Sequence, residues 1–194
     1  MNPERPEPGS MRQLLHREGK VREALASDKE DIHRIYLDAF TEAEAGEVAS
    51  LARDLLPGVP RSETFALVFE WRGDLIGHIA FSRIQYKGMK NGFGSILAPL
   101  AVTPKFQKTG IGSVLVREGL RRLKAFGTGR VFVYGDPDYY GRFGFRNELA
   151  QRFVPPFPLS QPHGWLGLVI GEPGDGIESA HLECVEALQR PELW

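Results

Sequence analysis

The chain has 194 residues, enough for one domain with a sizeable hydrophobic core. Its 24 basic and 25 acidic residues leave a formal net charge of −1, so charge balance gives no reason to expect binding to nucleic acid or to a membrane surface. The single cysteine, Cys184, excludes an intrachain disulfide framework and fits a reducing compartment. Because there is neither an apolar run of membrane-spanning length nor a secretory leader, we expect a cytoplasmic protein.

The N-terminal part of the chain has little hydrophobic periodicity. Residues 1–20 carry three prolines and several charges, which predicts a flexible arm before a single domain over residues 21–194. Ser27 to Glu30 has the spacing of a helix capping box, and the apolar pattern after it predicts an amphipathic helix. A second apolar stripe over 48–55 predicts another helix, ended by Pro57-Gly58, and the polar segment 41–46 predicts a linker between the two.

The hydrophobic period then changes to that of strands. Residues 64–71 and 75–84, separated by a short turn, predict an antiparallel hairpin, and 95–102 predict a third strand. Residues 111–126 predict a helix with one apolar face, and 131–135 predict a core strand after it. A strand–helix–strand unit of this length predicts that the strands at 95–102 and 131–135 run parallel.

The remaining elements complete an α+β chain. A short helix is predicted around 139–143, an irregular proline-containing stretch over 150–164, and a last strand over 165–170. The fold class is therefore a mixed, mostly antiparallel sheet flanked by helices. We expect a cleft where the two parallel strands diverge beside a glycine-containing loop.

That loop follows the third strand and is the expected site for a phosphate-bearing ligand. Backbone N–H groups at the start of a helix bind anions, and glycine lets a phosphate approach the backbone closely. Gly110-Ile111-Gly112 lacks the lysine that a P-loop carries directly after its last glycine. Leu115 stands where a dinucleotide-binding fingerprint has its third glycine. Both nucleotide-binding interpretations are therefore disfavoured.

Three patterns in order resemble the GNAT superfamily of N-acetyltransferases. They are the strand Leu100-Ala101-Val102-Thr103-Pro104, the loop Gln107 to Gly112, and the stretch Gly135 to Phe145, written GDPDYYGRFGF. The last is similar to the motif GDPxYYxRFGF of a bacterial group of predicted acetyltransferases. The resemblance covers about residues 21–170 and implies a GNAT-like (acyl-CoA N-acyltransferase) fold, with acetyl-CoA as cosubstrate and no metal.

The resemblance also implies which residues bind the cosubstrate. They are Leu100, Ala101, Val102, Gln107, Lys108, Thr109, Gly110, Ile111, Gly112 and Ser113. Leu100 and Val102 would pair through their backbones with the pantetheine arm, as an added strand does. The loop N–H groups would hold the pyrophosphate.

Tyr140 occupies the position of the tyrosine that commonly protonates the coenzyme thiolate in this family. A phenol is protonated at neutral pH, so it can donate a proton. The general base stays open, with Glu63, Glu70, His78 and Asp136 as candidates.

The expected activity is transfer of the acetyl group from acetyl-CoA to a primary amine of a small molecule, a peptide or a protein. The amine would attack directly in a ternary complex. The alternative is a non-catalytic acyl-CoA-binding sensor module of the same fold. The sequence determines neither the acceptor nor whether the protein is a monomer or a homodimer.

Overall fold

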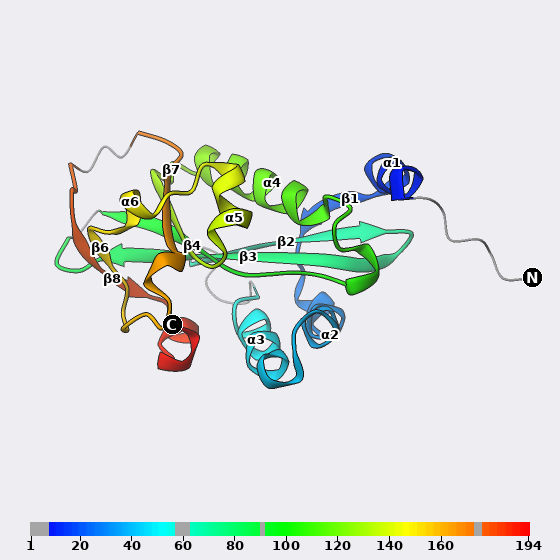
Figure 1. The fold of residues 1–194 in the computed structure, drawn as a ribbon, viewed down its shortest axis with the longest axis horizontal. Helices are drawn as coiled ribbons and strands as arrows, with labels where there is room; N and C mark the ends of the chain where they lie inside the picture. The colour runs from blue at the N-terminus through cyan, green and yellow to red at the C-terminus, as the bar shows by residue number, and fades with distance from the viewer. Residues whose placement is uncertain (1–7, 57–62, 90–91, 173–175) are drawn as a thin grey trace, which may run out of the picture.

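A computed structural model describes residues 8–56, 63–89, 92–172 and 176–194. Its centre is one mixed sheet with the strand order β1-β2-β3-β4-β5-β7, and β8 pairs with the end of β3 and with β6 (Figure 1). The strands are β1 (Lys20–Glu23), β2 (Thr64–Trp71), β3 (Asp74–Tyr86), β4 (Phe93–Val102), β5 (Arg130–Tyr134), β6 (Phe153–Val154), β7 (Trp165–Val169) and β8 (Ala180–Cys184). The helices are α1 (Pro8–Glu18), α2 (Lys29–Ala39), α3 (Glu42–Asp54), α4 (Ile111–Ala125), α5 (Pro137–Tyr140) and α6 (Asn147–Ala150).

The central part of the sheet agrees with the sequence-based prediction. Strand β2 has the predicted bounds, and β3 and β4 begin or end one or two residues beyond theirs. The predicted hairpin is present, because β2 and β3 pair antiparallel. The prediction of parallel strands on either side of α4 is also confirmed by the pairing of β4 with β5.

The two parallel strands separate partway along β4. They pair only over residues 95–97 and 131–133, whereas β4 continues to Val102 against β3. The edge of β4 over residues 98–102 that faces away from β3 therefore has no strand partner within the described part of the chain. This opening is the cleft expected from the sequence, and it lies directly before the glycine loop.

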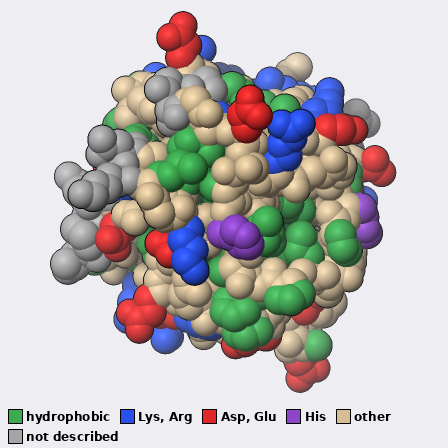
Figure 2. Space-filling view, turned by 90° about the vertical axis from the view of Figure 1, so that its left-hand side faces the viewer, with side chains coloured by type: hydrophobic (Ala, Val, Ile, Leu, Met, Phe, Trp, Pro, Cys, Tyr) green, Lys and Arg blue, Asp and Glu red, His purple; other side chains and the backbone are tan. Residues whose placement is uncertain are grey.

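Helices cover both faces of the sheet. Helix α4 lies on one face, and α2 and α3 lie on the other (Figure 1). Alternate residues of β2 supply the two cores: Leu67 packs in the cluster that contains Leu115 of α4, and Val68 in the cluster that contains Tyr36 of α2. On the face shown in Figure 2, charged side chains of both signs are scattered between hydrophobic ones, in keeping with the small net charge.

The predicted flexible arm over residues 1–20 is wrong for the part that the structure describes. Residues 8–18 form helix α1, and β1 pairs with β2. Leu15 is only 1% exposed and packs in the same core cluster as Phe69 and Phe106. One well-placed leucine and the pairing of β1 thus order a segment whose local composition gives little signal. Residues 1–7 lie outside the described residues.

The structure also corrects the predicted helix boundaries. Asp28, rather than Ser27, is the N-cap residue of α2. Its carboxylate accepts hydrogen bonds from the Leu25 N–H (2.7 Å) and from the Arg22 guanidinium (2.7 and 3.0 Å). The predicted linker over 41–46 is instead mostly the first turns of α3, because Thr41 serves as its N-cap residue. Pro57-Gly58, the predicted end of that helix, lie outside the described residues.

Candidate active site

A cavity of about 480 Å³ lies where β4 leaves β5 and the loop enters α4. Its lining includes all the predicted cofactor-binding residues except Thr109, namely Leu100, Ala101, Val102, Gln107, Lys108, Gly110, Ile111, Gly112 and Ser113. The Thr109 hydroxyl instead donates a hydrogen bond to the Phe106 carbonyl at 2.6 Å, which supports the shape of the loop. The structure therefore brings the strand segment and the loop to one concave site.

The start of α4 presents backbone donors to this cavity. Gly110 is the N-cap residue, with φ of 98°, a conformation that glycine adopts without steric cost. It has no side chain to cap the helix, and the Val114 N–H makes the first helical bond, to the Gly110 carbonyl at 3.0 Å. The N–H groups of residues 110–113 are the ones that an α-helix leaves without a partner of its own. Together with the helix dipole they favour an anion.

Gly112 has a second role that the sequence did not indicate. A Cβ atom at this position would clash with the hydroxyl of Tyr139, which also lines the cavity. Burial raises the pKa of Tyr139, although Arg142 and a hydrogen bond with Ser113 oppose the shift. The phenol is therefore neutral at neutral pH, and its hydroxyl lies over the first turn of α4.

Three cationic side chains surround the same cavity: Arg12, Lys108 and Arg142. The Arg142 Nε donates to the Tyr139 carbonyl at 3.1 Å, and its guanidinium lies 4.5 Å from the centre of the Tyr139 ring. Arg12 comes from α1. No carboxylate is among the described residues that line the cavity. The electrostatics therefore favour a ligand with several negative charges.

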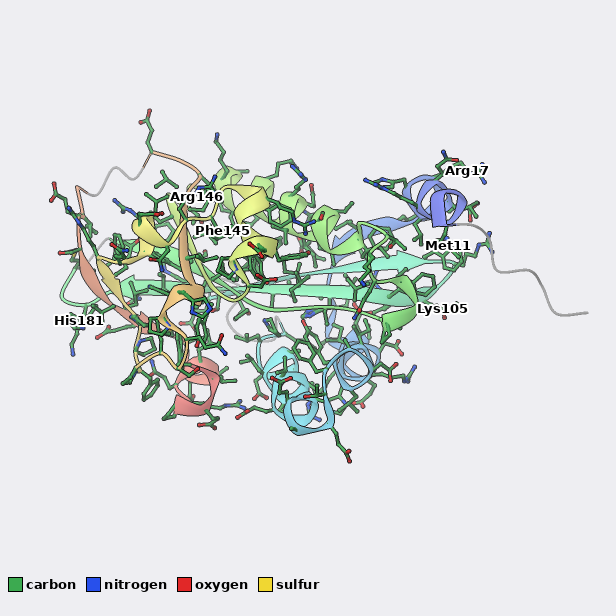
Figure 3. The ribbon with its side chains drawn as sticks, in the orientation of Figure 1. Met11, Arg17, Lys105, Phe145, Arg146 and His181 are labelled. Atoms are coloured by element: carbon green, nitrogen blue, oxygen red, sulfur yellow. The ribbon has the colours of Figure 1, made fainter. Side chains whose placement is uncertain are left out.

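Tyr140 does not line this cavity among the described residues, although its neighbour Tyr139 does. Its ring packs against Gly135, where a Cβ would approach the ring to 2.6 Å, and meets the Phe145 ring edge-on at 5.8 Å. In Figure 3, Phe145 is labelled next to Arg146, close to the α5 segment in this view. Burial raises the pKa of Tyr140, and Tyr139 and Asp136 add to the shift. The hydroxyl therefore keeps its proton at neutral pH.

A buried pair lies behind the cavity, on the α2 side of the sheet. The Tyr36 hydroxyl and His78 Nδ1 are 2.8 Å apart, and both side chains are fully buried. Tyr36 stacks on Phe40, which lines the cavity. Burial raises the pKa of Tyr36, and an electrostatic interaction with Tyr140 adds to the shift.

None of the four candidate bases is among the described residues that line the cavity. Burial lowers the pKa of His78 to about 3, so a proton binds it weakly at neutral pH. Glu70 forms an ion pair with Arg22 at 2.8 Å, and Glu63 lines a separate cavity near the end of α4. Asp136 caps α5 by accepting the Asp138 N–H at 2.8 Å.

The described residues contain neither a metal-binding cluster nor a membrane-spanning helix. No group of three or more His, Cys, Asp or Glu side chains in this part of the chain could hold a metal ion. No helix in it has both the length and the apolar character that crossing a membrane requires.

Comparison with known proteins identifies close sequence relatives. The family model described as "Acetyltransferase (GNAT) family" matches residues 29–145, a segment that contains both the loop and Tyr140. The chain is 37% identical over 140 residues to the uncharacterized N-acetyltransferase YjhQ of Escherichia coli K12. The matched segment covers 71% of this chain and 75% of that protein.

Solved structures of similar proteins extend the match over most of the chain. The GNAT family N-acetyltransferase YhbS of Escherichia coli, crystallised with CoA, is similar with a TM-score of 0.73 and 28% identity, over 89% of this chain and 93% of that one. A GNAT family acetyltransferase of Brucella melitensis in complex with acetyl-CoA gives a TM-score of 0.65 and 26% identity, over 88% and 97% of the two chains.

Proposed function

Because the chain belongs to the acetyltransferase (GNAT) family, we propose that it transfers the acetyl group of acetyl-CoA to a primary amine in a ternary complex. The observation that carries this proposal is the cavity at the opening of the sheet. There the N-terminus of α4 and the edge of β4 that has no strand partner among the described residues line one site together with three cationic side chains.

Two kinds of ligand group would match this cavity. The pyrophosphate would accept hydrogen bonds from the N–H groups of residues 110–113, with Lys108 nearby. The amides of the pantetheine arm would pair with the backbone of β4 at Leu100 and Val102, because that edge has no strand partner in the described residues. Support for acetyl-CoA comes from this combination and from the CoA and acetyl-CoA complexes of the two similar structures.

The reaction needs a neutral amine, a donor for the oxyanion and a proton for the leaving thiolate. The amine nitrogen attacks the thioester carbonyl carbon, a C–N bond forms and the C–S bond breaks. The proton that the nitrogen loses passes to solvent water. A backbone N–H of β4 near Leu100 would stabilise the oxyanion. Tyr140, whose hydroxyl is protonated at neutral pH, would give that proton to the leaving thiolate, although its side chain is not among the described residues that line the cavity. The Tyr140 phenolate then regains a proton from solvent. We assign the general base to none of the four candidates.

Two tyrosine variants test this assignment with a matched control. Thiol release from acetyl-CoA would be measured with a panel of primary amines for the wild type, Tyr140→Phe and Tyr139→Phe. Tyr140→Phe is expected to lower kcat by about 10²-fold while the KM for acetyl-CoA changes little, since it removes a proton donor. Tyr139→Phe is expected to change the KM, because Tyr139 lies at the loop.

Two outcomes would contradict the proposal. A Tyr140→Phe variant as active as the wild type would assign Tyr140 a packing role only. A wild type that binds acetyl-CoA tightly yet releases no thiol with any amine would favour the sensor alternative.

A further inference from the structure

We propose that helix α1 is part of the cofactor site and that the Arg12 guanidinium binds a phosphate group of coenzyme A. This inference rests on the proposed function. It adds a binding residue from the segment that lies before the region of family resemblance.

Arg12 is placed beside the phosphate-binding loop. Its side chain lines the 480 Å³ cavity, and its Nε lies 3.8 Å from where a Cβ on Gly110 would stand. Arg17 of the same helix pairs with Glu18 at 2.9 Å, but Arg12 makes no ion pair with any residue that the structure describes. The guanidinium is therefore an uncompensated cation next to four backbone N–H groups that also favour an anion.

The position of α1 is fixed by packing. Leu15 packs in the core cluster that contains Phe106, directly before the loop. The Glu18 carboxylate pairs with Arg72 of the β2–β3 turn at 3.0 Å. Figure 3 shows Met11 of α1 and Lys105 of the loop segment at the same end of the molecule. The helix is therefore held in place without the ligand, so little ordering is needed when a phosphate binds.

The chemistry of the group fits a phosphate. A guanidinium donates two parallel N–H bonds to phosphate oxygens, which a lysine cannot do. Coenzyme A carries a pyrophosphate and a 3′-phosphate, and either could lie within reach of an arginine at the Gly110 end of the loop. Arg12 then contributes to recognition of the nucleotide part of the coenzyme and leaves the acetyl group untouched.

Calorimetric titration with CoA and with dephospho-CoA tests the inference. The proteins are the wild type, Arg12→Ala and the control Arg17→Ala, which removes the same charge from the same helix outside the cavity. Arg12→Ala is expected to raise the Kd for CoA about fivefold to tenfold, and Arg17→Ala less than about twofold. Thermal unfolding of each variant checks that the fold is retained.

The outcomes separate this inference from the proposed function. A loss with both ligands assigns the contact to the pyrophosphate, and a loss with CoA alone assigns it to the 3′-phosphate; both support the inference. An unchanged Kd for Arg12→Ala, or an equal loss in the two variants, would overturn it while leaving the proposed function intact. A wild type that does not bind CoA would refute both.

Discussion

Mild acid is expected to destabilise this protein through one residue, His78. Its side chain is fully buried, and burial lowers its pKa from 6.5 to about 3. Below pH 6.5 the unfolded chain takes up a proton at this imidazole, whereas the folded chain does not until the pH approaches 3. The contribution of His78 to stability is therefore fully present above pH 6.5 and is lost as the pH falls.

The size of the effect follows from the difference between the two pKa values. The free energy of unfolding should fall by about 1.4 kcal/mol for each pH unit once the pH is well below 6.5. Between pH 7.5 and 5.0 the loss adds up to about 2 kcal/mol. This loss depends little on the exact pKa of His78 in the folded chain, because the whole interval from pH 7.5 to 5.0 lies above that pKa.

Urea unfolding at several pH values, followed by circular dichroism, measures this loss. The control is His78→Gln. Its side-chain amide can still accept a hydrogen bond from the Tyr36 hydroxyl, but it does not titrate. Glu118 does not interfere with this measurement. A hydrogen bond from Arg121, assisted by Arg122, lowers the pKa of Glu118 from 4.5 to about 2, so its contribution to stability is lost only as the pH falls below about 4.5. The difference in stability between wild type and variant should therefore shift by about 2 kcal/mol between pH 7.5 and 5.0. Parallel pH profiles for the two proteins would refute the reasoning.

Two glycine substitutions test the packing around α4. Gly112→Ala should weaken CoA binding in calorimetric titration, since the new Cβ clashes with the Tyr139 hydroxyl. Adding Tyr139→Phe removes that hydroxyl and leaves the nearest ring atom 3.6 Å from the new Cβ, so the double variant should regain part of the affinity. Gly119→Ala should lower the free energy of unfolding by about 1–3 kcal/mol although alanine favours helices, because its Cβ would meet the buried Phe81 ring; a more stable variant in urea unfolding would contradict this.

The sheet and the loop could be predicted because their signals are local. Runs of β-favouring and aromatic residues mark β2 and β3, and the apolar face of α4 has a clear helical period, so each element is encoded within its own residues. Helix α1 has no such signal. Leu15 is buried in the same core cluster as Phe69, a residue distant in sequence, and such packing cannot be derived from the composition of the segment.

The cavity residues also divide into those that a local sequence pattern predicts and those that only the packing of distant elements reveals. Nine of its residues come from one contiguous pattern and were predicted together. Tyr139 and Arg142 belong to the GDPxYYxRFGF stretch, but the sequence does not show that Tyr139, rather than Tyr140, faces the loop. Arg12 and Phe40 reach the site from α1 and from the end of α2, so only the packing of these helices reveals them.

The opening of the sheet favours acetyl-CoA over a nucleotide. The phosphates of a nucleotide need only the anion site, which the N-terminus of α4 and its cationic neighbours provide. The edge of β4 over residues 98–102 adds a row of backbone groups with no strand partner in the described chain, and such groups need a hydrogen-bonding partner when they are covered. A ligand that covers both regions must carry phosphates at one end and amides along an extended arm. Coenzyme A has both, so we propose that β4 and the loop bind it as one site.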